Sequence, residues 1–233
     1  MPPRDSTLLS CPRSRHRIQP LPSLRPRAQP DKVGGALSIP LGRRAYQRLR
    51  ARRELLPPAE LHYYCLIELR PALPNEADTL LAIQREAAVD AYAHVYPPER
   101  YPFPDDAVRA VWAEALADPE VEVYVAEVER VPAGAVSVGK GFLSTLYVLP
   151  AYQGCGVGSA LHDLAVERLR AQGFQEARLW TLEGNDAGRR FYERRGWVLT
   201  DETRVVPYPP NPIDVQYALP LDRWSPCRNG RRS

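Results

Sequence analysis

The stretch that decides the fold is residues 146–197, LYVLPAYQGCGVGSALHDLAVERLRAQGFQEARLWTLEGNDAGRRFYERRGW. It begins within an apolar run with strand character, residues 142–149, which ends at Pro150. Three glycines follow at alternate positions, directly before a long amphipathic segment: Gly154, Gly156 and Gly158. A glycine-rich turn between a strand and a helix leaves backbone N–H groups free at the positive end of the helix dipole. The stretch therefore predicts a phosphate-binding site.

Composition bounds the class of protein. The chain has 233 residues, of which 44% are hydrophobic, enough for a packed core. No apolar run reaches the roughly 20 residues that span a bilayer, so we expect no membrane span. The four cysteines are scattered without a CxxC pair, which disfavours a disulfide framework and a structural zinc site and favours a reducing, cytoplasmic location: Cys11, Cys65, Cys155 and Cys227.

Charge divides the chain. Residues 1–60 carry 13 Lys and Arg against 4 Asp and Glu, together with 10 of the 25 prolines, so we expect a largely disordered extension with at most a short helix at 43–56. This extension has three interpretations: a nucleic-acid-binding arm, a transit peptide or a dispensable segment. We favour the dispensable segment. Residues 61–222 form the predicted folded domain, and residues 223–233 are a basic tail. The folded part is acidic overall, so nucleic acid is not the expected partner.

Hydrophobic spacing predicts an alternation of elements from residue 61 onward. The predicted strands are residues 63–69, 120–129, 135–138, 142–149, 177–182, 197–204 and 213–221. The predicted helices are residues 75–94, 105–116, 159–172 and 186–195, the third ending at Gly173. A turn is expected at residues 131–134. This order predicts an α/β (α+β) fold, in which helices cover a mixed, mostly antiparallel sheet with one strand–helix–strand crossover.

With these elements in order, residues 142–197 resemble the GNAT superfamily of acyl-coenzyme A-dependent N-acetyltransferases. The resemblance rests on the strand end at 146–150, on Gln153, Gly156 and Gly158, and on Asn185 followed by the segment FYERRGW. It covers roughly residues 61–222 and implies a central sheet of about seven strands flanked by about four helices. A dinucleotide-binding fingerprint fits less well, since GxGxG is not GxGxxG and antiparallel strands precede the turn.

The resemblance implies acetyl-coenzyme A as the co-substrate, with no metal. Its pyrophosphate is expected at the turn of residues 153–159, which is Gln153, Gly154, Cys155, Gly156, Val157, Gly158 and Ser159. The main chain of the preceding strand would bind the pantetheine arm and polarise the thioester, through Leu146, Tyr147 and Val148. Tyr192 maps onto the family's general acid, and Asn185 is both a helix N-cap and a pantetheine partner. Cys155 is expected to be filler in the turn.

The sequence identifies neither the general base nor the acceptor. No carboxylate lies between Gly141 and Pro150, where many family members carry a glutamate. The alternatives for the general base are Glu127, Glu183, His94 or a chain of waters. An amine that binds already neutral would need no base. The family's acceptor pocket maps onto a second set of residues, which are Tyr92, Tyr96, Tyr101, Glu183 and Tyr208. Aromatic rings with a few carboxylates suit a cationic amine.

The predicted function is therefore N-acetyl transfer from acetyl-coenzyme A to a primary amine of a small molecule or of a protein N-terminus, by direct attack in a ternary complex. The alternative is a catalytically silent acyl-coenzyme A-binding sensor of the same fold, which the missing strand glutamate keeps open. The expected partners are the amine acceptor alone, without a membrane, and a homodimer is one of the oligomeric states left open.

Overall fold

The computed structural model describes residues 37–40 and 66–222. Its strands are β1 (Leu37–Pro40), β2 (Leu66–Pro71), β3 (Val121–Val128), β4 (Val131–Gly139), β5 (Phe142–Val148), β6 (Glu176–Leu182), β7 (Val198–Val205) and β8 (Ile213–Pro220). Its helices are α2 (Ala77–Tyr92), α3 (Asp105–Ala117), α4 (Val157–Ala171) and α5 (Asp186–Glu193), with a 3-10 turn, η1 (Pro150–Tyr152). None of the helices in these residues is long and apolar enough to cross a membrane.

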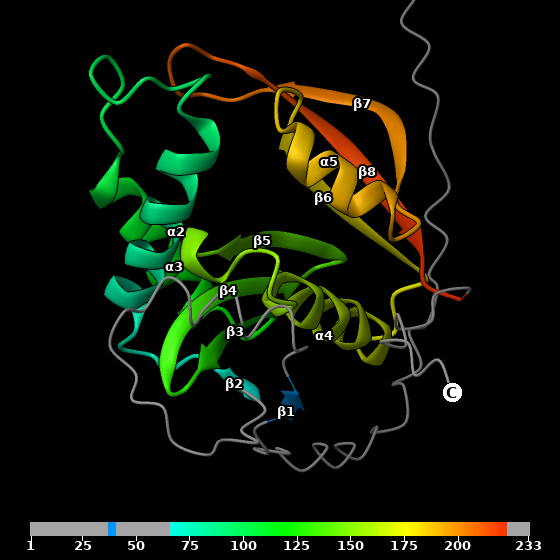
Figure 1. Ribbon diagram of the computed structural model, residues 1–233. Coiled ribbons are helices and arrows are strands. Elements are labelled where there is room, and N and C mark those ends of the chain that lie inside the picture. Colours follow the sequence, from blue (N-terminus) through cyan, green and yellow to red (C-terminus); the bar gives the residue numbers. More distant parts are fainter. Residues whose placement is uncertain (1–36, 41–65, 223–233) are drawn as a thin grey trace, which may run out of the picture. The chain divides into compact units, whose positions relative to one another are not determined.

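The strands form one sheet in the order β1-β2-β3-β4-β5-β6-β8-β7 (Figure 1). Neighbouring strands are antiparallel except β5 and β6, which are parallel because α4 carries the chain between them. This arrangement confirms the predicted fold class. The strand β1 was not expected from the sequence. The predicted helix at 43–56, the first residues of the strand at 63–69 and the tail at 223–233 lie outside the described residues.

The β3–β4 hairpin turns earlier than the sequence suggests. Glu129 and Arg130 form the turn, with φ of 53° and 64°, and β4 begins at Val131. The predicted turn at 131–134 was wrong because it relied on Gly134 as a turn glycine. Gly134 instead lies within β4, where a Cβ atom would stand 2.7 Å from the carbonyl oxygen of Tyr147 on β5. The glycine serves close strand packing and not chain reversal.

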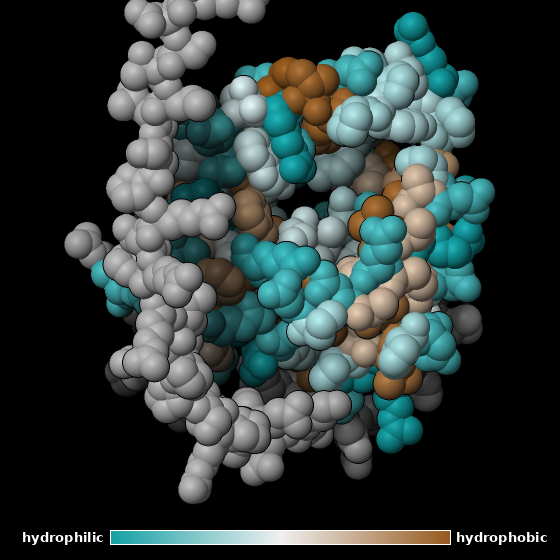
Figure 2. Space-filling model, turned by 180° about the vertical axis from the view of Figure 1, so that it is seen from behind, coloured by the Kyte–Doolittle hydropathy of each residue, from teal (hydrophilic) through white to brown (hydrophobic). Residues whose placement is uncertain are grey.

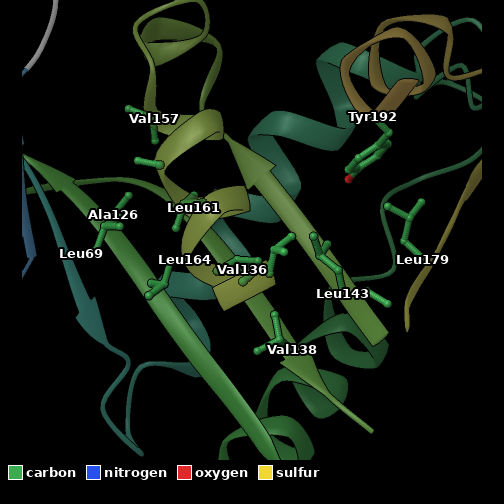
Figure 3. Packing of buried hydrophobic residues seen from close by; sticks show 14 of the residues in the cluster. Leu69, Ala126, Val136, Val138, Leu143, Val157, Leu161, Leu164, Leu179 and Tyr192 are labelled. Atoms are coloured by element: carbon green, nitrogen blue, oxygen red, sulfur yellow. The ribbon is translucent and has the colours of Figure 1, made fainter. Parts of the chain in front are cut away.

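Helices cover both faces of the sheet. One face packs against α2 and α3 through a cluster centred on Trp112, Leu80 and Val125. The other face packs against α4, whose Val157, Leu161 and Leu164 lie against strand residues such as Val136 and Val138 (Figure 3). Seven of the nine residues of β4 are buried, as expected for a central strand with a helix layer on each side.

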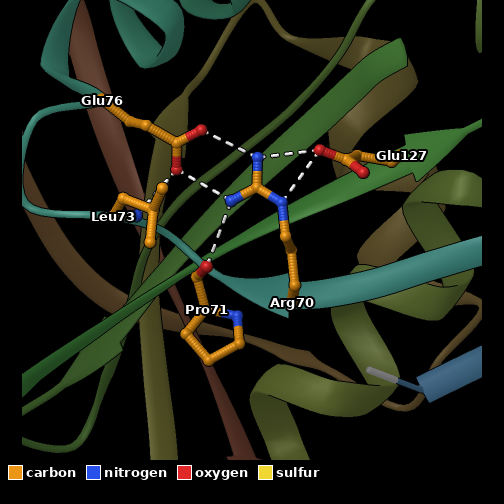
Figure 4. A network of polar contacts seen from close by, with 5 residues as sticks. All are labelled: Arg70, Pro71, Leu73, Glu76 and Glu127. Atoms are coloured by element: carbon orange, nitrogen blue, oxygen red, sulfur yellow. Dashed lines mark hydrogen bonds and ion pairs between the residues drawn. The ribbon is translucent and has the colours of Figure 1, made fainter. Parts of the chain in front are cut away.

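A charged network fixes the entry into α2. Arg70 on β2 donates from Nε to Glu127 on β3 at 2.8 Å, and from both terminal nitrogens to Glu76 at 2.7 and 2.8 Å (Figure 4). Glu76 also accepts from the backbone N–H of Leu73. The pKa of Glu76 is lowered, chiefly by its hydrogen bond from Arg70. The guanidinium thus ties two strands to the turn that starts the helix.

The sheet opens between β5 and β6. These strands pair at a single position, Phe142 opposite Arg178, where the Arg178 N–H donates to the Gly141 carbonyl at 2.9 Å. Beyond it the two strands are not paired, whereas β6 continues along β8 from Glu176 to Leu182. The backbone groups of β5 that face β6 are therefore without a strand partner. This divergence positions the candidate site.

Candidate active site

A cavity of about 990 Å³ occupies the opening between β5 and β6. Its walls come from the second half of α2, from β5, from the turn before α4, from β6 and α5, and from the segment of residues 204–214. The space-filling view from behind shows a hollow near the middle of the molecule's face (Figure 2). A cavity of this size can hold an extended ligand together with a second, smaller molecule.

The turn before α4 leaves a helix N-terminus without a cap. Gly156 is the N-cap residue, with φ of 93° and no side chain to accept a hydrogen bond. The first helical bond runs from the N–H of Ala160 to the carbonyl of Gly156. The N–H groups of Val157, Gly158 and Ser159 therefore have no acceptor within the helix. Gly154, Gly156, Gly158 and Ser159 line the cavity, so this end of the helix offers an anion site inside it.

Of the other residues predicted in the turn, one faces the cavity and two are buried in the core. Gln153 lines the cavity, and its side-chain amide donates to the Val148 carbonyl at 3.2 Å. Cys155 and Val157 are buried in the core, and neither lines the cavity. Their side chains pack the turn against the sheet, and only their backbone groups could meet a ligand.

A cationic side chain lies beside this helix end. Arg195 donates from Nη2 to the Ser159 hydroxyl. Its guanidinium stacks on the Phe191 ring, 3.7 Å from the ring centroid. Arg194 and Arg195 both line the cavity. These arginines were not predicted as site residues from the sequence, although the ERRGW segment contains them. Together with the helix dipole they make this end of the cavity positive.

The strand residues predicted to bind the acyl donor do face the cavity. Leu146, Tyr147 and Val148 line it, from the part of β5 that is unpaired toward β6. The register between β4 and β5 shifts here, so that Ser144 lacks a partner on β4. Such an irregularity re-aims the backbone where a strand borders a site.

Tyr192 brings a phenol to the cavity from α5. Its ring packs edge-on against Phe191 and Trp197, with centroid distances of 5.3 and 5.9 Å. Figure 3 shows the ring projecting from α5, with its hydroxyl oxygen at the far end. The hydroxyl has no hydrogen-bond partner within residues 66–222. Burial raises the pKa of Tyr192, so the phenol keeps its proton at neutral pH.

Asn185 caps α5, as the sequence predicted. Its side-chain oxygen accepts from the Gly188 N–H at 3.0 Å. Its amide nitrogen donates to the Thr181 hydroxyl at 2.9 Å and to the Tyr92 hydroxyl at 3.3 Å. The side chain thereby links α5 to β6 and to α2 across the cavity wall, and both amide protons already have acceptors.

Four predicted tyrosines form the opposite part of the cavity. Tyr92, Tyr96, Tyr101 and Tyr208 all line it. The Tyr96 ring lies 6.4 Å from that of Tyr101 and 5.7 Å from that of Tyr208, between centroids. The Tyr208 hydroxyl donates to the carbonyl of Pro102 and bridges two loops that are distant in sequence. The structure thus brings together the aromatic side chains that the sequence analysis had grouped.

The carboxylates and the histidine considered as bases lie elsewhere. Glu183 is exposed and does not line the cavity. Glu127 is bound to Arg70 at the β2–β3 pair. His94 is exposed, with its Nε2 3.0 Å from the Gly184 carbonyl. None of the three faces the cavity.

One carboxylate that was not predicted from the sequence does face the cavity. Asp214, near the start of β8, is buried and lines the cavity together with Arg204 and Trp180. Arg204 on β7 binds its Oδ2 through Nε and Nη2, at 3.0 and 2.8 Å. The available signal was an acidic residue within an otherwise apolar strand, IDVQYALP.

The cavity thus combines a separated sheet edge, a helix N-terminus without a cap and a buried phenol, which is the arrangement that the sequence predicted for an acyl-coenzyme A-dependent transferase. Residues 86–197 match the family model described as Acetyltransferase (GNAT) family. The chain belongs to the GNAT family of acetyltransferases, which use acetyl-coenzyme A. A comparison with curated proteins found no match.

Solved structures with the same fold agree with this assignment. The GCN5-related N-acetyltransferase: aminotransferase, class-II, from Rhodopseudomonas palustris is 25% identical, over 65% of this chain and 94% of its own, with a TM-score of 0.55. The protein yncA from Salmonella typhimurium, solved with its cofactor acetyl-CoA, is 22% identical, over 68% of this chain and 96% of its own, with a TM-score of 0.53. The PaiA N-acetyltransferase from Thermoplasma acidophilum, solved with coenzyme A, is 20% identical over 64% and 97%, with a TM-score of 0.50.

Proposed function

We propose that this protein transfers the acetyl group of acetyl-coenzyme A to a primary amine, of a small molecule or of a protein N-terminus, by direct attack in a ternary complex. The observation that carries the proposal is the shared cavity. It contains the uncapped N-terminus of α4, the unpaired edge of β5 and the hydroxyl of Tyr192. These are an anion site, a peptide-like binding edge and a proton donor.

The donor fits this cavity by its own chemistry. Its pyrophosphate is matched by the N–H groups of Val157, Gly158 and Ser159 and by the positive charge of Arg195. Its pantetheine arm contains amide groups, which can pair with the free edge of β5 as an added strand would. In this orientation the backbone N–H groups of residues 146–148 polarise the thioester carbonyl. Asn185 contributes the remaining lone pair of its side-chain oxygen, since the other accepts from Gly188.

Transfer requires that the ammonium form of the acceptor lose two protons in all. The neutral amine attacks the thioester carbon, the C–N bond forms, and the C–S bond breaks as the tetrahedral intermediate collapses. One proton reaches the departing thiolate through the phenol of Tyr192, and the other leaves to solvent. Burial raises the pKa of Tyr192 and keeps this proton in place until a thiolate forms beside it. Cys155 is buried outside the cavity, which supports direct attack over an acyl-enzyme.

The test is acetyl-coenzyme A turnover with a panel of primary amines, followed by release of free thiol. Wild-type protein should release thiol with at least one amine. The variant Tyr192→Phe should lower kcat by roughly 100-fold, the low end of what a general acid contributes, and should leave the Kd for coenzyme A unchanged. Equal kcat in the variant would refute the role of the phenol.

One observation favours the silent acyl-coenzyme A sensor as a second candidate. Within residues 142–149 there is no carboxylate that could act as a base. The same panel distinguishes the two candidates, because tight coenzyme A binding without thiol release from any amine would favour the sensor.

A further inference from the structure

Asp214 is a buried carboxylate with one unused oxygen. Asp214 is 7% exposed, and both hydrogen bonds from Arg204 go to its Oδ2 atom. Within the described residues no donor is directed at Oδ1, and Asp214 lines the cavity. A buried carboxylate oxygen that faces a cavity without a donor gains most from a ligand that supplies one.

The arginine partner binds the other carboxylate oxygen, Oδ2. The Arg204 guanidinium lies over the Trp180 ring, 4.6 Å from its centroid, and its side chain is 55% exposed. Arg204 also lines the cavity, but both of its hydrogen bonds to Asp214 end at Oδ2. Oδ1 of the carboxylate therefore remains available to a second donor.

Aromatic rings line the same cavity as Asp214. Tyr96 and Tyr208 pack on each other there, and Tyr92 and Tyr147 line the same space. Burial is the largest cause that raises the pKa of Tyr92, Tyr96 and Tyr147. The negative charge of Asp214 is one of the further causes. These three phenols thus stay neutral near a negative charge. Neutral rings beside a carboxylate favour a cation by cation–π contact and disfavour an anion.

Tyr147 connects this region with the reacting end of the cavity. The charge interactions that raise its pKa, after burial, include those with Tyr192 and with Asp214. Both groups therefore lie within electrostatic range of one phenol on β5. All three residues line the same cavity, so an acceptor beside Asp214 would share that cavity with the donor.

We propose that the acceptor of this enzyme is a primary amine that binds as its ammonium cation, donating a hydrogen bond to Oδ1 of Asp214 among the rings of Tyr96 and Tyr208. The inference rests on the proposed function and narrows it to cationic amines without an anionic group next to the nitrogen. Asp214 is in this view a substrate-binding residue that sets specificity, and no covalent step is assigned to it.

The experiment measures kcat/KM for cationic and for neutral amines at neutral pH. Histamine, spermidine, tyramine and a peptide with a free N-terminus serve as ammonium probes, and phenylhydrazine serves as the neutral one. In Asp214→Asn we expect kcat/KM for the ammonium probe that the wild type prefers to fall about 10- to 100-fold, the loss of one charge-assisted hydrogen bond, and to change little for phenylhydrazine. The Kd for coenzyme A and the Tm report whether the variant is folded.

Two controls separate charge recognition from loss of the ion pair. Asp201→Asn makes the same chemical change on β7, at an exposed residue outside the cavity, and should leave all rates unchanged. Arg204→Met breaks the same ion pair but retains the Asp214 carboxylate, so it should keep the preference for ammonium over phenylhydrazine. Equal losses in Asp214→Asn for ammonium and neutral amines, or loss of the preference in Arg204→Met, would overturn the inference alone. Wild-type protein that releases no thiol with any amine would overturn the proposed function and this inference with it.

Discussion

At the scale of single residues, the glycines of the turn before α4 are required for different reasons. Gly156 has a φ of 93°, which side-chain-bearing residues rarely adopt, so it is needed for the backbone. Gly158 has an ordinary helical conformation, and a Cβ there would lie at 3.5 Å from Val148 and 3.7 Å from Phe191, which is normal contact. The folded protein therefore has no need of glycine at 158. We therefore expect that glycine at 158 serves to leave ligand space beside the N–H groups of the helix N-terminus.

The substitution Gly158→Ala separates these two requirements. We expect the free energy of unfolding to rise by about 0.5–1 kcal/mol, because alanine stabilises a helix relative to glycine. We expect the Kd for coenzyme A to rise about tenfold, since the methyl group occupies the approach to the helix N-terminus and weakens a charge-assisted hydrogen bond. Urea unfolding and calorimetric titration measure the two effects. Unchanged affinity would remove the turn from the donor site, and Gly156→Ala serves as the contrasting variant, destabilised by its backbone.

At the scale of elements, α4 is tied to the start of β7 by a buried histidine. The Trp197 Nε1 donates to Nε2 of His162 at 2.9 Å, and Nδ1 of His162 lies 2.9 Å from a carboxylate oxygen of Asp163. The His162 ring is fully buried, edge-on to Phe191 and Trp197. Burial lowers the pKa of His162, and the weaker opposing effect of Asp163 does not reverse this. The neutral ring that accepts from Trp197 is thus the form in the folded protein.

This link predicts an acid-sensitive stability. Above the unfolded pKa of about 6.5, His162 is neutral in both states and its contribution is fully present. As the pH falls below that value the unfolded chain takes up a proton and the folded chain does not, so the stability declines by up to about 1.4 kcal/mol per pH unit until the lowered folded pKa is reached. Urea unfolding between neutral and mildly acidic pH measures the decline. In His162→Gln, which can still accept from Trp197 but does not titrate, the slope should be smaller, and parallel curves would contradict the assignment.

The elements also show what the sequence could predict. Strand and helix order followed from apolar spacing because each element buries one side, and Gly173 ends α4 as expected, with a φ of 91°. The side of the cavity that we propose for the donor was predictable because its residues lie within one stretch of the chain, residues 146–197. Asp214 was not, since its importance depends on Arg204 and Tyr96 meeting it from other elements. The hairpin turn at Glu129 was missed because neither of its residues is a typical turn former.

At the scale of the whole molecule, β1 adds a strand to the edge of the sheet that is distant from the cavity. Leu37–Pro40 pairs antiparallel with β2, from Leu37 opposite Leu69 to Pro40 opposite Leu66. Among the residues that the structure describes, those that line the cavity begin at Gln84. Stability at this edge and ligand binding therefore depend on separate parts of the chain.

Two truncations test that separation. A chain that begins at residue 34 keeps β1, and a chain that begins at residue 61 lacks it and leaves the backbone groups of β2 unpaired. We expect both to bind coenzyme A with the same Kd and to release thiol at the same rate, because the cavity residues are unchanged. The shorter chain should have the lower Tm and associate more readily, since an unpaired strand edge recruits further strands. Equal Tm values would show that β1 adds nothing to the sheet, whereas loss of coenzyme A binding in the shorter chain would show that the extension contributes to the site.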